Sequence, residues 1–268
     1  MIDQTTADQV EIDAAIAYEE LFVPSLFAPW TGPMADAACL GPGNRVLDVA
    51  CGTGALTRMV AERVKPGGSV VGLDLNTGML SVAAKRSPEI QWQQGSADAL
   101  PFQAGVFDAV VCQFGLMFFP DPQAAIREML RVLAPGGRLV VAVWDASEHS
   151  PAFAVVDEIY QRHLGDGIQV ALREPYVFGN PRRLATLFAG THPHAVSIET
   201  RRVKACFPDA LSMVRGDLEG WLPRVQVSLN KVQIAAILAE AEHALGPFIT
   251  PHGTLECLVS AHIASVTK

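Results

Sequence analysis

The sequence predicts an α/β protein with a doubly wound, mostly parallel sheet. Strand-like apolar runs alternate with helical stretches, and Leu139–Val143 is continuously apolar, as in a strand buried on both faces. Glycine-rich turns occur where a helix must end and a strand must begin, at Pro66–Gly68 and Pro135–Gly137. Alternation of this kind is typical of open sheets covered by helices on both faces.

The alternating region contains five expected strands and three expected helices. Period-two and continuous apolar runs place the strands at Arg45–Ala50, Ser69–Leu73, Ile90–Gln94, Ala109–Gln113 and Arg138–Val143. Helical spacing of apolar residues places the helices at Gly54–Val64, Thr77–Lys85 and Gln123–Leu133.

The two ends of the chain depart from this alternation. Residues 8–40 read as helical, with interruptions at Pro24 and Pro29. After Trp144 the expected elements are a helical insertion over 150–178, a short helix at Pro181–Ala189, an edge strand at His194–Phe207, a mostly helical stretch at Leu211–Leu245 broken at Gly220 and Pro223, and a last strand at Leu255–Val266. The two late strands complete a sheet of seven. Because no linker is visible, we expect the late region to be a cap built onto the same core.

The composition favours a small-molecule partner over a nucleic acid. The chain has 268 residues, 50% hydrophobic and 18% charged, with a net charge of −8. An acidic protein repels phosphate backbones, and the basic clusters at Arg182–Arg183 and Arg201–Lys204 are short. Five cysteines without a C-x-x-C pair indicate reduced thiols rather than disulfides or a zinc site. We therefore expect a cytoplasmic monomer or homodimer, without signal peptide, membrane span or metal.

The first strand runs into a glycine-containing turn, Val46–Gly54. Gly52 and Gly54 would let backbone N–H groups approach a ligand closely. A dinucleotide-binding fingerprint would need a third glycine at position 57, where this chain has Thr57. Thr57 therefore argues against an NAD-dependent oxidoreductase, which remains the weakest of the alternatives.

Two acidic residues follow the next strands at the same expected edge of the sheet. Asp74 ends the second strand, where a carboxylate can accept hydrogen bonds from both ribose hydroxyls of an adenosine. Its alternative role is an N-cap, which Asn76 or Thr77 could fill instead. Asp98 lies just past the third strand and could accept a hydrogen bond from the amino group of an adenine, or merely cap its loop.

These pieces together resemble the class I S-adenosylmethionine-dependent methyltransferases. The resemblance is strongest to the group that includes the ubiquinone/menaquinone C-methyltransferases and many natural-product methyltransferases, and it covers about residues 15–145. The segments that carry it are Val46–Gly54, Asp74, Asp98, Phe107–Phe114 and Leu133–Val143. One departure is Ala50, where the family has a glycine.

The resemblance implies a Rossmann-like seven-stranded sheet with an antiparallel last strand, in one methyltransferase domain over residues 1–268. Residues 8–40 would form an N-terminal helical lid, 41–145 the cofactor-binding core, and 150–178 with 209–250 the cap. The cofactor would be S-adenosylmethionine, with S-adenosylhomocysteine as product. The implied cofactor-binding residues are Asp48, Ala50, Gly52, Thr53, Gly54, Asp74, Leu75, Met79, Ala97, Asp98, Ala99, Gln113 and Phe114.

The acceptor side is defined less sharply. A dry aromatic pocket suits the charge dispersal of methyl transfer from a sulfonium, and the candidate residues for it are Tyr18, Phe27, Trp30, Phe118 and Trp144. Each could equally be ordinary core. Tyr18 and His149 are the catalytic candidates, His149 as a general base after the fifth strand or else a solvated loop histidine. The expected activity is methyl transfer to an oxygen, nitrogen or carbon atom of a small molecule, and the alternative is a protein that binds the cofactor without transferring methyl.

Overall fold

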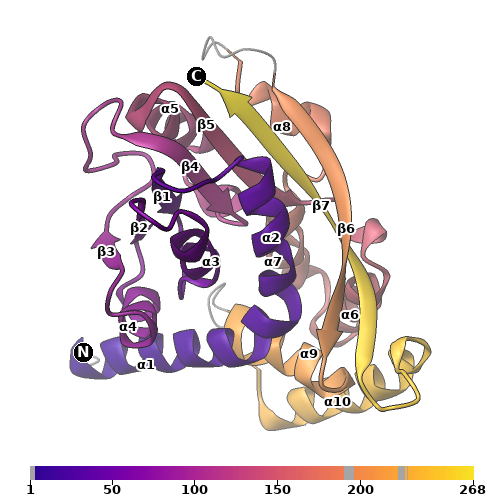
Figure 1. The fold of residues 1–268 in the computed structure, drawn as a ribbon. Coiled ribbons are helices and arrows are strands. Elements are labelled where there is room, and N and C mark those ends of the chain that lie inside the picture. Colours follow the sequence, from indigo (N-terminus) through magenta and orange to yellow (C-terminus); the bar gives the residue numbers. More distant parts are fainter. Residues whose placement is uncertain (1–3, 190–195, 223–226, 228) are drawn as a thin grey trace.

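A seven-stranded sheet forms the centre of the computed structural model, which describes residues 4–189, 196–222, 227 and 229–268 (Figure 1). Its order is β3-β2-β1-β4-β5-β7-β6, with β1 to β5 parallel and β7 antiparallel to both β5 and β6. The strands are β1 Arg45–Val49, β2 Ser69–Asp74, β3 Gln91–Gln94, β4 Phe107–Gln113, β5 Leu133–Trp144, β6 Ser197–Phe207 and β7 Leu255–Thr267. The predicted doubly wound sheet with an antiparallel last strand is confirmed.

The helices surround this sheet. The α-helices are α1 Gln4–Ala17, α2 Ala28–Ala37, α3 Ala55–Arg63, α4 Thr77–Arg86, α5 Pro122–Val132, α6 Pro151–Leu164, α7 Gln169–Arg173, α8 Pro181–Thr186, α9 Ala210–Gly216 and α10 Lys231–Ala244. The shorter or irregular helices are η1 Tyr18–Phe27, η2 Leu116–Phe118, η3 Ser147–His149, η4 Asp166–Ile168, η5 Glu174–Tyr176, η6 Asp217–Trp221 and η7 Gly246–Phe248.

The central parallel strands β1 and β4 are buried on both faces, as their apolar sequences predict, whereas β3 at the edge of the sheet is not. Val46 and Leu47 of β1, and Val110 and Val111 of β4, have no exposed surface. Burying a side chain of this size fully contributes roughly 1.5–3 kcal/mol. Side-chain caps fix where helices begin after these strands, for example Asn76 Oδ1, which accepts the Met79 N–H at 2.9 Å at the start of α4.

The N-terminal segment is more continuous than its prolines predict. Pro24 does not interrupt it, because the chain takes a π-helical conformation over η1 and Pro24 lies inside that helix. Pro29 stands in the first turn of α2, where a missing N–H costs nothing. In Figure 1, α1 lies across the base of the molecule beside α4, and α2 lies beside α3.

Strand β5 differs from the prediction at its start. Leu133 already pairs with Phe107, so the strand begins five residues earlier than Arg138 and includes Pro135–Gly137, which the sequence predicted as a turn before the strand. The register then shifts between Phe107 and Ala109, so the extra residues form an irregularity within the ladder.

The late region forms a long ribbon and a helical cap. Strands β6 and β7 extend past the parallel part of the sheet toward α9 and α10 (Figure 1). The first two residues of the predicted edge strand, 194 and 195, and the predicted break at residue 223 lie outside the described part of the chain. None of the helices that the structure describes combines the length and the apolar character needed to cross a membrane.

Candidate active site

Asp74 and the turn after β1 lie side by side at the carboxyl edge of the sheet. The Gly52 N–H donates to Asp74 Oδ2 at 2.8 Å, and the Asn76 N–H donates to Oδ1 at 2.9 Å. Because Asn76 caps α4, the alternative role of Asp74 as that helix's N-cap is wrong. Asp74 therefore braces the glycine turn at the edge where ligands of open α/β sheets bind.

The two glycines of the turn serve different purposes. The Gly54 N–H donates to the Cys51 carbonyl at 2.9 Å, and a Cβ on Gly54 would lie 2.4 Å from the ring of Trp92. A Cβ on Gly52 would meet only Tyr18, at 3.9 Å. Both N–H groups donate inside the protein, and the backbone at Gly52 has no atom closer than Tyr18 on the side where a Cβ would lie.

Asp48 lies behind this turn, almost fully buried. The Thr57 hydroxyl donates to Asp48 Oδ2 at 2.6 Å, so the residue that breaks the dinucleotide fingerprint anchors the acid of β1. Burial raises the pKa of Asp48 to about 7, with the Thr57 hydrogen bond opposing the rise and the charge of Asp74 adding to it.

The expected adenine side contains an exposed apolar residue. Leu75 is 67% exposed, directly after Asp74, whereas Met79 in α4 is half-buried. Ala97 is buried, and Asp98 beside it is exposed and accepts a hydrogen bond from the Ser96 hydroxyl. These residues come from the ends of β2 and β3, which pair in parallel register.

Five of the predicted aromatic residues form one cluster. Phe114 and Trp144 stack with ring centroids 3.7 Å apart and planes 8° apart. Trp30 meets them edge-on at 5.6 and 6.0 Å. Phe27 lies 5.9 Å from Phe114 and 5.0 Å from Tyr18. This aromatic cluster joins the ends of β4 and β5 to the N-terminal segment, while Phe118 lies on η2 just after β4.

Several buried polar atoms in the described part of the chain have no partner, one of them on Trp30 of this cluster. Among the described residues, Trp30 Nε1, Thr53 Oγ1 and Gln113 Oε1 have no hydrogen-bond partner. The other end of the Gln113 amide donates to the Phe27 carbonyl at 3.2 Å. An unpaired buried polar atom costs about 1–3 kcal/mol, so a polar ligand that reaches these atoms would gain affinity.

An ion-pair group fastens the lid region over the turn. Glu19, 5% exposed, accepts from Arg58 at 2.9 Å and lies 3.1 Å from Arg86. Arg58 also donates to the Thr53 carbonyl at 2.7 Å. Residue 19 follows Tyr18, so the ring above Gly52 is held in place by the core helices α3 and α4.

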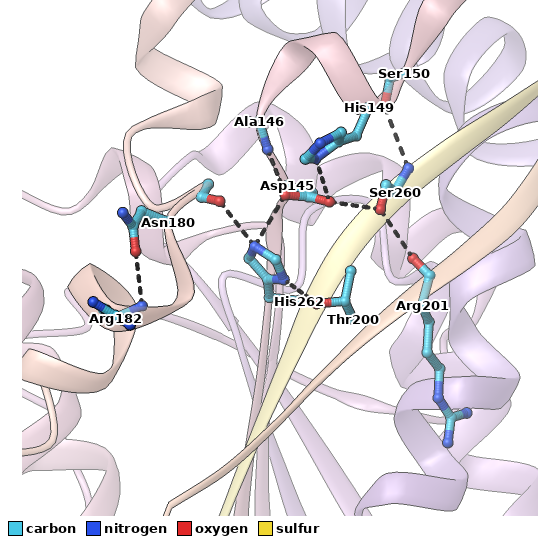
Figure 2. A network of polar contacts seen from close by, with 11 residues as sticks. Asp145, Ala146, His149, Ser150, Asn180, Arg182, Thr200, Arg201, Ser260 and His262 are labelled. Atoms are coloured by element: carbon cyan, nitrogen blue, oxygen red, sulfur yellow. Dashed lines mark hydrogen bonds and ion pairs between the residues drawn. The ribbon is translucent and has the colours of Figure 1, made fainter.

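His149 has a placed carboxylate partner. Its Nδ1 lies 2.9 Å from Asp145 Oδ2, and its side chain is 48% exposed (Figure 2). Sequence reasoning missed Asp145, although an acid directly after β5 and four residues before a histidine was visible. It also missed Glu19 and Arg58, which lie 39 residues apart and carry no sequence signal for their contact.

Residues 47–141 match the family described as a methyltransferase domain. The matched segment runs from β1 into β5 and includes Gly52, Asp74 and Asp98. The predicted resemblance is thereby confirmed for the core, while the lid and cap regions lie outside the match.

Relatives that match about half of this chain include enzymes named for quinones. A demethylmenaquinone methyltransferase of Renibacterium salmoninarum is 44% identical over 135 residues, covering 50% of this chain and 56% of that protein. A 2-phytyl-1,4-naphtoquinone methyltransferase of Thermosynechococcus vestitus is 40% identical over 138 residues, covering 50% of this chain and 60% of that protein. The chain thus spans little more than half the length of these curated relatives.

Solved structures share the fold at low identity. YcgJ from Bacillus subtilis has a TM-score of 0.59 at 19% identity, covering 89% of this chain and 97% of that one. Phosphoethanolamine N-methyltransferase 2 of Haemonchus contortus, in complex with S-adenosyl-L-methionine, has a TM-score of 0.61 at 16% identity, covering 99% and 58%. The [4+2]-cyclase SpnF has a TM-score of 0.50 at 21% identity, covering 87% and 80%, so the fold alone does not define the reaction.

Proposed function

We propose that the protein transfers a methyl group from S-adenosylmethionine to a small-molecule acceptor. The observation that carries the proposal is the pairing of Asp74 with the Gly52 turn at 2.8 Å, within the matched methyltransferase domain. That pairing puts the Asp74 carboxylate, Gly52 and the exposed Leu75 at one edge of the sheet, which supports the proposal.

The residues present fit this cofactor. Asp74 would bind the ribose hydroxyls, Leu75 and Met79 would pack against the adenine, and the loop of Asp98 would meet its polar edge. The space beneath Tyr18 at Gly52 would take the methionine part, next to the unpaired Thr53 hydroxyl. The remaining residues assigned to the cofactor are Asp48, Ala50, Gly54, Ala97, Ala99, Gln113 and Phe114.

When bound, S-adenosylmethionine supplies an electrophilic methyl group on a sulfonium. The chain's own contribution is to exclude water and to align the acceptor with the methyl group. Well-aligned reactants reach effective molarities of about 10⁵ M or more, which accounts for most of the acceleration. Tyr18, Phe27, Trp30 and Trp144 would supply the dry wall, with Phe118 beside them. Tyr18 would also close the site, since Glu19 fixes it to the core.

The acceptor would be selected by the cap, which lies outside the matched family segment. The net charge of −8 supports a small molecule rather than a nucleic acid. The names of the relatives make reduced naphthoquinones the first acceptors to try. We also propose a cytoplasmic monomer or homodimer; the five free cysteines support that compartment.

The test is transfer of a labelled methyl group. The full chain is incubated with methyl-labelled S-adenosylmethionine and a panel of reduced naphthoquinones, phenols and amines. The proposal expects labelled product from at least one acceptor, and much less product from the Asp74→Ala variant at a cofactor concentration below its dissociation constant. Binding of S-adenosylhomocysteine without product from any acceptor would support a cofactor-binding protein that does not transfer methyl and would overturn the proposal.

A further inference from the structure

Asp145, at the carboxyl end of β5, accepts three hydrogen bonds and lies within ion-pair distance of His262 (Figure 2). Oδ1 receives the Ala146 N–H at 2.8 Å and lies 3.1 Å from His262 Nε2. Oδ2 receives the Ser260 hydroxyl at 2.8 Å and lies 2.9 Å from His149 Nδ1. The side chain of Asp145 is 6% exposed, so this carboxylate has one fixed orientation.

The carboxylate of Asp145 is ionised at neutral pH. Burial alone would raise its pKa, but the hydrogen bonds from His149, Ser260 and the Ala146 N–H outweigh burial, and the pKa lies below its ordinary value. An ionised carboxylate only accepts hydrogen bonds. The Ala146 N–H, the Ser260 hydroxyl and His149 must therefore each present a proton to it.

This requirement assigns the proton of His149. In neutral His149, Nδ1 carries the proton that Asp145 accepts, so Nε2 keeps its lone pair. Among the described residues, Nε2 of His149 has no hydrogen-bond partner. The ring thus presents a free basic nitrogen at the end of β5, where Trp144 belongs to the aromatic cluster.

Strand β7 keeps Asp145 in this position. The Asp145 N–H donates to the Ser260 carbonyl at 3.1 Å. His262, 2% exposed, has Nε2 2.9 Å from the Gly179 carbonyl as well as near Asp145, so Nε2 carries its proton. Its Nδ1 then accepts from the Thr200 hydroxyl at 2.8 Å. These contacts tie β5, β6, β7 and the loop before α8 to one carboxylate.

We infer that Asp145 is the positioning residue of a general base, His149, that takes a proton from the methyl acceptor. The inference rests on the proposed function and deepens it. It assigns the acceptor to molecules whose nucleophilic group must lose a proton, such as a hydroxyl, rather than to tertiary amines or thioethers, which need no base.

The proton transfer balances with the displacement. The acceptor's O–H proton moves to Nε2 of His149 while the oxygen forms its bond to the methyl carbon and the carbon–sulfur bond breaks. The electron pair of that bond stays on sulfur as the neutral thioether product. Because His149 is 48% exposed, the proton passes from its ring to water.

The direct test is the tautomer of His149, which does not require an identified acceptor. The full chain, labelled with ¹⁵N-histidine, is measured by ¹H–¹⁵N correlation NMR with saturating S-adenosylhomocysteine, and His149→Gln assigns the signal among the seven histidines. The expected wild-type signal is the Nδ1–H tautomer, which changes to mainly Nε2–H in Asp145→Ala. A wild-type Nε2–H tautomer, or no change in Asp145→Ala, would overturn the inference.

A second histidine–carboxylate pair supplies the matched control. His163 Nε2 lies 2.6 Å from Glu240 Oε2, between α6 and α10. Glu240→Ala leaves the His149 signal unchanged if Asp145 acts locally. If Asp145→Ala does not fold, Ser260→Ala is measured in its place. The His149 Nδ1–H tautomer should persist in Ser260→Ala, because Asp145 alone sets that tautomer. Loss of the Nδ1–H tautomer in Ser260→Ala would contradict this role of Asp145.

Turnover separates the inference from the proposed function. With a hydroxyl acceptor from the panel, His149→Gln lowers kcat by about 10²-fold or more, with unchanged affinity for S-adenosylhomocysteine, and added imidazole restores part of the rate to His149→Ala. Unchanged kcat with normal binding overturns the dyad alone. If the wild-type protein does not bind S-adenosylhomocysteine, that result overturns the proposed function instead.

Discussion

The methyl group of Ala50 occupies the space that a side chain at Gly115 would need. A Cβ on Gly115 would lie 2.5 Å from Cβ of Ala50, and 3.1 Å from Sγ of Cys112. Ala50 follows β1 with a φ of 57°, a left-handed conformation that costs alanine roughly 1–2 kcal/mol. Ala50 is thus both strained and dependent on the glycine that follows the neighbouring strand β4.

The contact between Ala50 and position 115 predicts that substitutions at the two residues change the free energy of unfolding non-additively. Gly115→Ala should reduce the free energy of unfolding by about 1–3 kcal/mol, because the new methyl group overlaps Ala50. In the Ala50→Gly background the same change should cost less, although the contact with Cys112 remains. Urea unfolding of the four proteins measures the coupling, and strictly additive effects would show that the two residues do not share this space.

The contact of Glu19 with Arg58 predicts a lid whose closure depends on charge. Glu19→Gln removes one charge of a nearly buried pair, an effect of about 1–3 kcal/mol. We expect faster hydrogen exchange over residues 18–27 and about 10-fold faster release of S-adenosylhomocysteine. The exposed neighbour Glu20→Gln is the control. Exchange in Glu19→Gln equal to that of the wild type would refute the anchoring role.

A buried carboxyl in the cap predicts a stability that falls with pH. Burial, with the charge of Asp157 second, raises the pKa of Asp217 to about 8, and its oxygen lies 3.4 Å from the Tyr160 hydroxyl. Between about pH 4 and pH 8 the folded state keeps a proton that the unfolded state releases. The unfolded state therefore binds fewer protons, and this group's contribution to stability decreases as pH rises.

Asp217→Asn removes that pH dependence. We expect the variant to be more stable than the wild type at pH 8, by the order of 1–3 kcal/mol, and to differ little from it at pH 5. Thermal unfolding at both pH values measures the difference, with Glu219→Gln of the same helix as the control. An equal effect at both pH values would mean that Asp217 does not hold a proton in the folded state.

Much of the fold follows from local sequence signals. The apolar runs predict the parallel strands because a strand buried on both faces needs no polar alternation. The same logic brings Asp74 to the Gly52 turn, since neighbouring parallel strands end at one edge. Asn76 as the cap of α4 was equally readable from its chemistry and position.

Other features depend on contacts that no local pattern encodes. Thr57 argues against a dinucleotide site in the sequence, but only the packing of α3 on β1 shows that its hydroxyl binds Asp48. Pro24 is read as a break because a π-helix that absorbs it has no local signature. Asp145 gains its role from Ser260 and His262, more than a hundred residues away on β7.

Calorimetric titration with S-adenosylhomocysteine tests whether Asp74 and the Gly52 turn form the binding site of S-adenosylmethionine. We expect micromolar binding to the wild type and an affinity lowered by about 1.5–3 kcal/mol, roughly 10- to 100-fold, in Asp74→Ala. Asp108→Ala is the matched control, because that carboxylate binds Arg45 at 2.8 Å at the opposite end of the strands and should leave the affinity unchanged. No binding by the folded wild type, or an unchanged dissociation constant in Asp74→Ala, would contradict the account.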